Sequence, residues 1–174
     1  MAPLGRNIAI SALFTLFGGP GILLFYVPWR ITHFRIPDDE PLALAGSAVV
    51  LIAAGLVPLL ESILRFIVVG RGTLVPTAPP EHLVVTGLYR YVRNPMYVGV
   101  LTAIAGEAVL FGRRGMAVHF AVVALAMHLF VRLYEEPKLE RTFPLEYPRY
   151  RRNVRRWLPR WTPWNASPSA SRSS

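Results

Sequence analysis

The chain has 174 residues, 53% of them hydrophobic, and its mean hydropathy of +0.38 is too high for an ordinary soluble domain. It has no cysteine, which excludes disulfides, thiolate metal ligands and cysteine nucleophiles. The formal net charge of +9 comes mostly from the C-terminal part. These features indicate one compact unit built in a membrane.

Four apolar runs predict an all-α integral membrane bundle of about four transmembrane helices, because a span needs about 20 such residues. The runs cover residues 7–29, 41–60 (with a helix that could continue to 69), 95–111 and 115–131. The last two flank a tight turn and are expected to form a helical hairpin. The first is longer than the apolar region of a signal peptide and lacks a clear cleavage site, so we interpret it as a span.

The basic residues predict the orientation of this bundle. Four spans place both ends of the chain on one side of the membrane. Of the 19 Lys and Arg residues, 15 lie on the same side of the membrane as the two ends of the chain. The other four lie in the two loops on the opposite side: Arg30, Arg35, Arg113 and Arg114. By the positive-inside rule, both termini and the loop before residue 95 are expected to be cytoplasmic.

The segment of residues 83–99, LVVTGLYRYVRNPMYVG, is a polar stretch that leads into the third apolar run. Asn94 is a favoured N-cap residue and Pro95 a favoured first helical residue, so a helix should begin at Pro95. Free backbone N–H groups and Arg93 would then lie at its start. Such a helix start attracts an anionic group, which predicts a ligand site at the membrane edge.

A polar stripe is predicted at the end of the fourth run. His128, Arg132 and Glu136 are spaced four apart, and Glu135 lies three residues after Arg132, which places them on one helix face. A solvated helix end with an Arg–Glu pair explains the same spacing. His119 and His128 are nine residues apart and therefore face opposite ways, which argues against a metal site on this helix.

One carboxylate falls within an apolar run, and another directly follows one. Glu107 is the only carboxylate in the third run, where a charge is usually functional or paired, although it could also reach the basic turn that follows. Glu61 and Arg65 stand four apart in the second helix and are expected to neutralise each other.

A longer pattern joins segment 83–99 to the C-terminal part of the chain. Its residues are Leu83, Val84, Gly87, Tyr89, Arg93, Pro95, Tyr97 and Gly99, then a helical hairpin, then Glu135, Glu136, Phe143, Tyr147, Tyr150, Val154, Trp157, Leu158 and Pro159. This pattern resembles the isoprenylcysteine carboxyl methyltransferase family, and phospholipid N-methyltransferases look related at the same positions. The resemblance covers about residues 70–160. It implies a membrane-embedded, S-adenosylmethionine-dependent methyltransferase without a Rossmann domain.

The resemblance also implies roles for single residues. The residues expected to line the cofactor are Glu81, His82, Leu83, Val84, Tyr89, Asn94, Pro95, Met96 and Tyr97, with Glu135 closing the pocket. An arginine before the glutamates holds an acidic substrate group in such enzymes, and Arg132 is the nearest candidate. The chain departs from the family pattern at Asn94 (usually His), Pro144 (usually Gly) and Pro137, which interrupts the acidic run.

The chemistry of the residues fits this expectation. Arg93 and the helix start could take the cofactor carboxylate, and Glu135 or Glu136 its ammonium or ribose hydroxyls. Tyr89 or Tyr97 could face the sulfonium by cation–π attraction. A carboxylate or thiolate acceptor needs no general base. An amine acceptor would need one, for which His128 and Glu107 are the candidates.

We therefore predict a single methyltransferase domain over residues 1–162 and a disordered tail over residues 163–174. Its acceptor would be a lipidic or hydrophobic small molecule that enters from the bilayer between helices, with no metal and no nucleic acid involved. Two alternatives stay open. One is a non-enzymatic membrane module whose C-terminal arginines and tryptophans dock on anionic lipid or a protein partner. The other is a reductase of similar membrane fold that uses NADPH.

Overall fold

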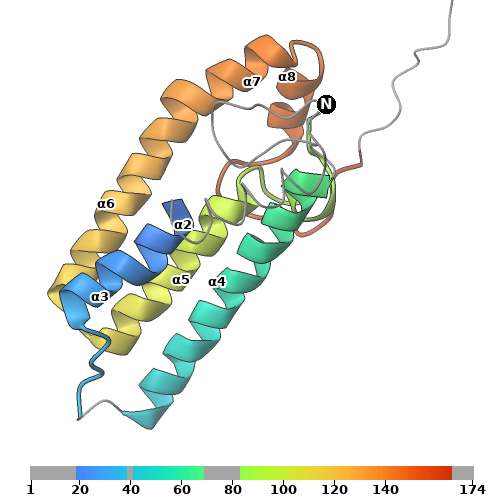
Figure 1. The fold of residues 1–174 in the computed structure, drawn as a ribbon. Helices are drawn as coiled ribbons and strands as arrows, with labels where there is room; N and C mark the ends of the chain where they lie inside the picture. Colours follow the sequence, from blue (N-terminus) through green and yellow to red (C-terminus); the bar gives the residue numbers. More distant parts are fainter. Residues whose placement is uncertain (1–18, 39–40, 69–82, 166–174) are drawn as a thin grey trace, which may run out of the picture.

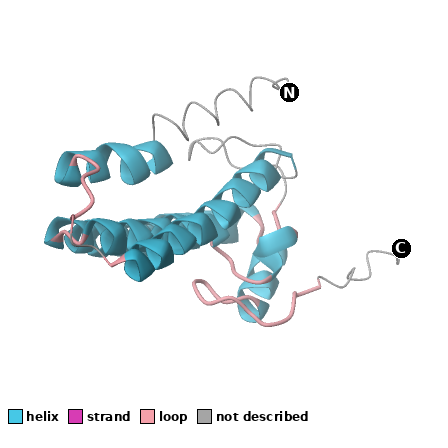
Figure 2. Ribbon diagram, turned by 90° about the horizontal axis from the view of Figure 1, so that it is seen from below, coloured by secondary structure: helices cyan, strands magenta, loops and turns pink. Residues whose placement is uncertain are grey.

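A computed structural model describes residues 19–38, 41–68 and 83–165, and every regular element in these ranges is helical (Figures 1 and 2). The elements in chain order are α2 (Gly19–Gly21), η1 (Ile22–Tyr26), α3 (Val27–Thr32), α4 (Leu42–Val68), η2 (Gly87–Arg90), α5 (Pro95–Phe111), α6 (Arg114–Phe130), η3 (Val131–Glu135), α7 (Glu136–Thr142) and α8 (Glu146–Asn153). Of these, η1 and η3 are π-helices and η2 is a 3₁₀ helix. The predicted all-α class is confirmed for these ranges.

Two of the described helices are long and apolar enough to cross a membrane. They are Leu42–Arg65 and the continuous helix Arg114–Thr142, while Pro95–Phe111 is apolar but shorter. Residues 7–18 of the first predicted span lie outside the described residues, so the count of four spans stays a prediction. Large apolar side chains point outward along α4 and α6, including Val50, Val57 and Val122, as expected of helices that face lipid.

The central helix is α5, which lies between α4 and α6 (Figure 1). Its contact with α4 is built from small residues. A Cβ atom on Gly55 would lie 2.5 Å from the backbone nitrogen of Ala103 and 2.5 Å from the carbonyl oxygen of Gly99. The two backbones therefore approach as closely as glycine allows, which is a common packing mode of helices in membranes.

The predicted hairpin of α5 and α6 is present. Gly112 follows the last residue of α5 with φ of +57°, and its N–H donates to the carbonyl of Ala108 at 3.2 Å. This left-handed conformation is the usual helix C-cap, and it favours glycine. Arg113 is then extended, and α6 begins at Arg114.

Both π-helices end two residues before a proline. η1 ends at Tyr26 before Pro28, and η3 ends at Glu135 before Pro137. Proline lacks an N–H and its ring crowds the carbonyl four residues earlier, so a wider turn at this place relieves the clash and lets the helix continue. As a result, the chain stays helical from Arg114 through Pro137 to Thr142.

Candidate functional site

The segment before α5 is held by the C-terminal end of the described chain. We call residues 83–94 the motif loop and residues 154–165 the strap. Three backbone hydrogen bonds of 2.9 Å join them: from the N–H of Arg93 to the carbonyl of Arg155, from Arg160 to Tyr91, and from Trp164 to Arg90. The motif loop therefore takes its shape from a segment about 60 to 75 residues later in the chain.

Side chains strengthen this junction. The hydroxyl of Tyr150 donates to the carbonyl of Tyr89 at 2.6 Å, and the amide of Asn94 donates to the carbonyl of Arg156 at 3.1 Å. The helix α5 begins at Pro95 as predicted, and Asn94 is its N-cap residue. However, the Asn94 side chain makes no cap hydrogen bond. The predicted N-cap position is therefore confirmed, although the side chain bonds the strap through its amide nitrogen and does not cap the helix.

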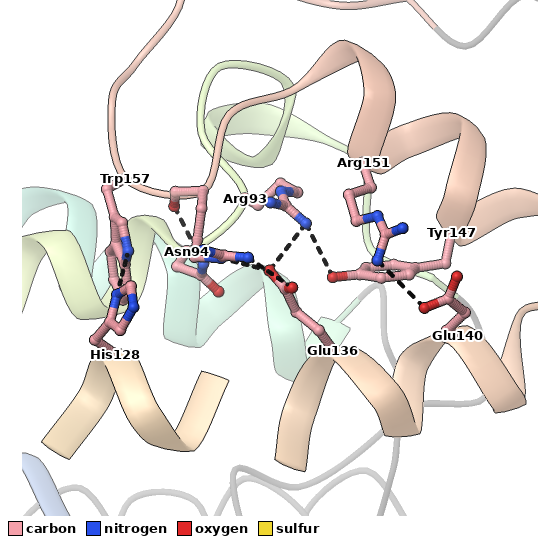
Figure 3. Close-up of polar contacts among 9 residues, drawn as sticks. Arg93, Asn94, His128, Glu136, Glu140, Tyr147, Arg151 and Trp157 are labelled. Carbon is pink, nitrogen blue, oxygen red and sulfur yellow. Dashed lines mark hydrogen bonds and ion pairs between the residues drawn. The ribbon is translucent and has the colours of Figure 1, made fainter. Parts of the chain in front are cut away.

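A buried ion cluster, shown in Figure 3, lies at the centre of the junction. Glu136 contacts Arg93 at 3.0 Å and receives two hydrogen bonds from Arg156, at 2.6 and 2.8 Å. The side chains of Arg93 and Glu136 are each only 8% exposed. Arg93 also donates to the hydroxyl of Tyr147 at 3.1 Å. Burial raises the pKa of Tyr147 to about 12, so this hydroxyl is neutral at pH 7.

This cluster gives two of the predicted cofactor residues partners within the protein. The carboxylate of Glu136 is shared by two guanidinium groups, and Arg93 is paired with it. Both were predicted to contact a cofactor, and this stays a prediction. In the structure they join the motif loop to α7 and to the strap.

A second polar cluster lies between the motif loop, α5 and η3. The carboxylate of Glu135 faces the hydroxyl of Tyr97 within hydrogen-bonding reach. Its other oxygen, Oε2, is buried and has no hydrogen-bond partner among the described residues. Burial, followed by the charges of Glu135 and Glu61, raises the pKa of Tyr89 well above its ordinary value. These groups therefore share one buried environment, in which one carboxylate oxygen has no hydrogen-bond donor.

The α4 helix also contributes to this second cluster. The sequence did not predict this contribution. Glu61 and Arg65 form the expected i, i+4 ion pair, but the pair also abuts Gly87 of the motif loop. Gly87 has φ of +55°, and a Cβ there would overlap the Arg65 guanidinium and the Glu61 carboxylate. In the sequence, this contact is indicated only by the ion pair at the end of an apolar run and by a glycine in the motif loop.

The polar stripe predicted on the fourth helix is divided by η3. Glu136 is buried, whereas Arg132, four residues earlier, is exposed. His128 is half-buried, and its Nδ1 accepts a hydrogen bond of 3.3 Å from the indole of Trp157 in the strap (Figure 3). His119 instead contacts the carbonyl of Leu23 at 3.0 Å.

The other predicted residues lie as follows. Val84 and Pro95 are buried, Leu83 packs beside Tyr147 and Tyr150, and Met96 packs on the apolar core that includes Val100. Glu107 is buried ten residues along α5 from Tyr97, which is about 15 Å along a helix axis. Glu81 and His82 lie outside the described residues. Within the described ranges, no group of three His, Cys, Asp or Glu side chains could hold a metal ion.

The fold and the site indicate a helical, membrane-associated protein with a buried polar cluster at one end of its apolar helices. A family model described as phospholipid methyltransferase matches residues 44–146, which is more than half of the chain. The chain therefore belongs to the phospholipid methyltransferase family. Searches among curated proteins and among solved structures give no significant match. Family membership indicates a methyltransferase that works at a membrane.

Proposed function

We propose that the protein transfers a methyl group from S-adenosylmethionine to a lipidic or hydrophobic acceptor at the membrane. The observation that carries this proposal is the unsatisfied Oε2 of Glu135 beside Tyr89 and Tyr97. A buried acceptor without a donor is costly unless a ligand supplies one. S-adenosylmethionine has an ammonium and ribose hydroxyls that can do so. The family match favours methyl transfer over the reductase alternative.

The residues that would hold the cofactor come from both parts of the pattern. Glu135 would accept hydrogen bonds from the ammonium or the ribose, and the rings of Tyr89 and Tyr97 would face the sulfonium. The motif loop and the start of α5 would line the pocket through Leu83, Val84, Asn94, Pro95 and Met96, with Glu81 and His82 before them. Arg93 and Glu136 would act as positioning residues that hold this wall in place.

When bound, the cofactor supplies a methyl group that is activated on a sulfonium. Methyl transfer is an in-line displacement, so the protein mainly has to align the two partners and exclude water, and alignment can contribute about 7–11 kcal/mol. The strap and the motif loop would close the polar side of the site. A carboxylate or thiolate acceptor needs no proton acceptor.

An amine acceptor would need a general base. We propose His128 for this role rather than Glu107, because Glu107 lies far along α5 from Tyr97. Arg132 is exposed and would be available to an acidic group of the acceptor that approaches from outside the bundle.

We further propose that four spans place the site and both termini in the cytoplasm, within one methyltransferase domain. The domain would include Trp164, which is hydrogen-bonded to Arg90 and packs on Tyr150 at 5.7 Å between ring centroids. Residues 166–174 of the predicted tail lie outside the described residues.

Calorimetric titration with S-adenosylhomocysteine tests the proposal on the full chain in phosphatidylcholine nanodiscs. Glu135→Gln is expected to weaken binding by about tenfold or more, because it weakens a hydrogen bond to a charged group. Glu140→Gln is the matched control, since the Glu140 side chain is 44% exposed in an ion pair with Arg151. A folded wild-type protein that does not bind S-adenosylhomocysteine would end the proposal.

A second candidate function concerns the outer face of the strap. Trp161 is 99% exposed and Leu158 is also exposed, beside the exposed arginines Arg151, Arg152 and Arg155. Tryptophan and arginine together favour an interface with anionic lipid. If the strap docks there, brominated phosphatidylglycerol should quench the wild type more than Trp161→Phe. Equal quenching in both proteins would argue against docking.

A further inference from the structure

One contact between the strap and α6 has no part in the roles assigned above. The indole N–H of Trp157 donates to Nδ1 of His128 at 3.3 Å, and the two rings are inclined by 29° with 6.1 Å between their centroids (Figure 3). Both side chains are half-buried. The contact therefore lies at the edge of the polar junction and not in its buried centre.

This contact fixes where the ring of His128 carries its proton. An indole N–H can only donate, so Nδ1 supplies its lone pair to the bond and carries no proton itself. A neutral imidazole has one N–H group, which is then on Nε2. A proton on Nδ1 would set two N–H groups against each other. The one basic nitrogen of this ring is therefore engaged by Trp157.

The engaged nitrogen is the one that an amine acceptor would need. The proton of the acceptor ammonium would have to move to Nδ1, since Nε2 already has one, and the amine nitrogen would keep the electron pair. Nδ1 is occupied in this structure. His128 can therefore take a proton only after the indole of Trp157 has turned away. A carboxylate or thiolate acceptor has no such requirement.

The contact can open while the strap stays bound. Arg156 precedes Trp157 in the strap and is held independently of it. Its guanidinium donates to Glu136 at 2.6 and 2.8 Å, and its carbonyl accepts from Asn94 at 3.1 Å. All three bonds are shorter than the bond of Trp157. Because one neutral hydrogen bond shifts an equilibrium by only about two- to tenfold, rotation of the indole alone would expose Nδ1.

We propose that Trp157 is a positioning residue that withholds His128 from use as a base as long as its indole is docked. The inference rests on the proposed function and deepens it by linking the strap to the class of acceptor. With Trp157 docked, the site serves acceptors that need no removal of a proton. With Trp157 turned away, it can also serve an amine.

Carbethoxylation by diethylpyrocarbonate measures whether the lone pair of His128 is free. The ring nitrogen attacks a carbonyl of the reagent, and the leaving ethyl carbonate takes the remaining ring proton and decomposes to ethanol and carbon dioxide. The full chain in phosphatidylcholine nanodiscs would be labelled at one fixed pH, with the rate at His128 measured by mass spectrometry. Benzothienylalanine in place of Trp157, which has sulfur where the indole has N–H, should raise this rate at least about threefold. Trp157→Phe should raise it as well.

Two comparisons separate this effect from a general loosening of the strap. Trp161→Phe changes a strap side chain that is 99% exposed, and it should leave the rate at His128 unchanged. His119 lies on the same helix as His128, and its Nε2 contacts the carbonyl of Leu23 at 3.0 Å. Its own rate should not respond to the change of Trp157. Circular dichroism would establish that all forms fold.

Equal rates at His128 in the wild type and in the benzothienylalanine form would overturn the proposal. So would an equal rise in Trp161→Phe or at His119, because the strap would then control access in general. Calorimetry with S-adenosylhomocysteine is a separate measurement. If the wild type does not bind it, the methyltransferase proposal fails, whereas the labelling rates still decide whether Trp157 engages the lone pair.

Discussion

The helix α5 is held in two different ways along its length. Where it packs on α4, the contact consists of glycine and alanine backbones that almost touch, as at Gly55 and Gly99. At its N-terminus, the contact consists of backbone hydrogen bonds and a buried ion cluster between the motif loop, α7 and the strap. The first interface is built from small residues, whereas the second combines a buried ion cluster with the apolar cluster around Tyr147, Tyr150 and Val154.

The difference follows from the surroundings of each interface. Lipid provides no hydrophobic force between helices, so close packing of small residues is the available source of attraction. The motif loop is irregular, and its backbone groups need partners, which the strap supplies. The packed interface should therefore be sensitive to added volume, and the polar junction to the loss of a charge or a donor.

Loss of the central carboxylate should have the largest effect on the polar junction. Glu136→Gln would leave Arg93 buried without a counter-charge, and we expect the free energy of unfolding to fall by about 3–5 kcal/mol. Chemical unfolding in detergent, followed by circular dichroism, would measure this. Glu140→Gln, on the same helix but in an exposed pair, should change it by less than about 1 kcal/mol. Equal effects of the two changes would contradict the role of the cluster.

Added volume should have the next largest effect. Gly55→Ala places a methyl group against the backbone of Ala103 and Gly99, and overpacking of this kind costs about 1–3 kcal/mol. Gly46→Ala is the control, because a Cβ there meets nothing within 4 Å. It should stabilise the helix by about 0.5–1 kcal/mol. Thermal unfolding in detergent separates the two, and a shift of the same sign for both would refute close packing.

Removal of one donor in the junction should have a smaller effect. Tyr150→Phe deletes the hydroxyl that bonds the carbonyl of Tyr89, and we expect a loss of about 0.5–1.5 kcal/mol. Tyr134→Phe removes a hydroxyl that makes only a 3.4 Å contact with Lys138, so its effect should be near zero. Hydrogen exchange of the motif loop should rise in the first variant alone. If it does not, the bond to Tyr89 does not restrain the loop.

The smallest effect is expected on the outer face of the strap. Trp161→Ala should change the free energy of unfolding by less than about 0.5 kcal/mol, because the side chain is almost fully exposed. Trp164→Ala should cost more, because its ring packs on Tyr150. Denaturant midpoints of the two variants would rank them, and the reverse order would show that the strap is held elsewhere.

The sequence by itself determined the features that depend on neighbours along the chain. The apolar runs predicted the helices and the tight turn between the last two, and Pro95 predicted the start of α5. The spacing of His119 and His128 predicted that they face opposite ways. Such features follow from local periodicity and from the conformations that proline and glycine allow. The family pattern gave the residues of both halves of the candidate site but not their contacts.

Only the tertiary structure decided which polar groups face each other. Arg93 pairs with Glu136, 43 residues later, and Asn94 binds the strap 62 residues later instead of capping its own helix. Glu136 is buried in the ion cluster, whereas Arg132, four residues earlier on the same helix, is exposed. These contacts depend on how distant segments pack, which no local pattern encodes.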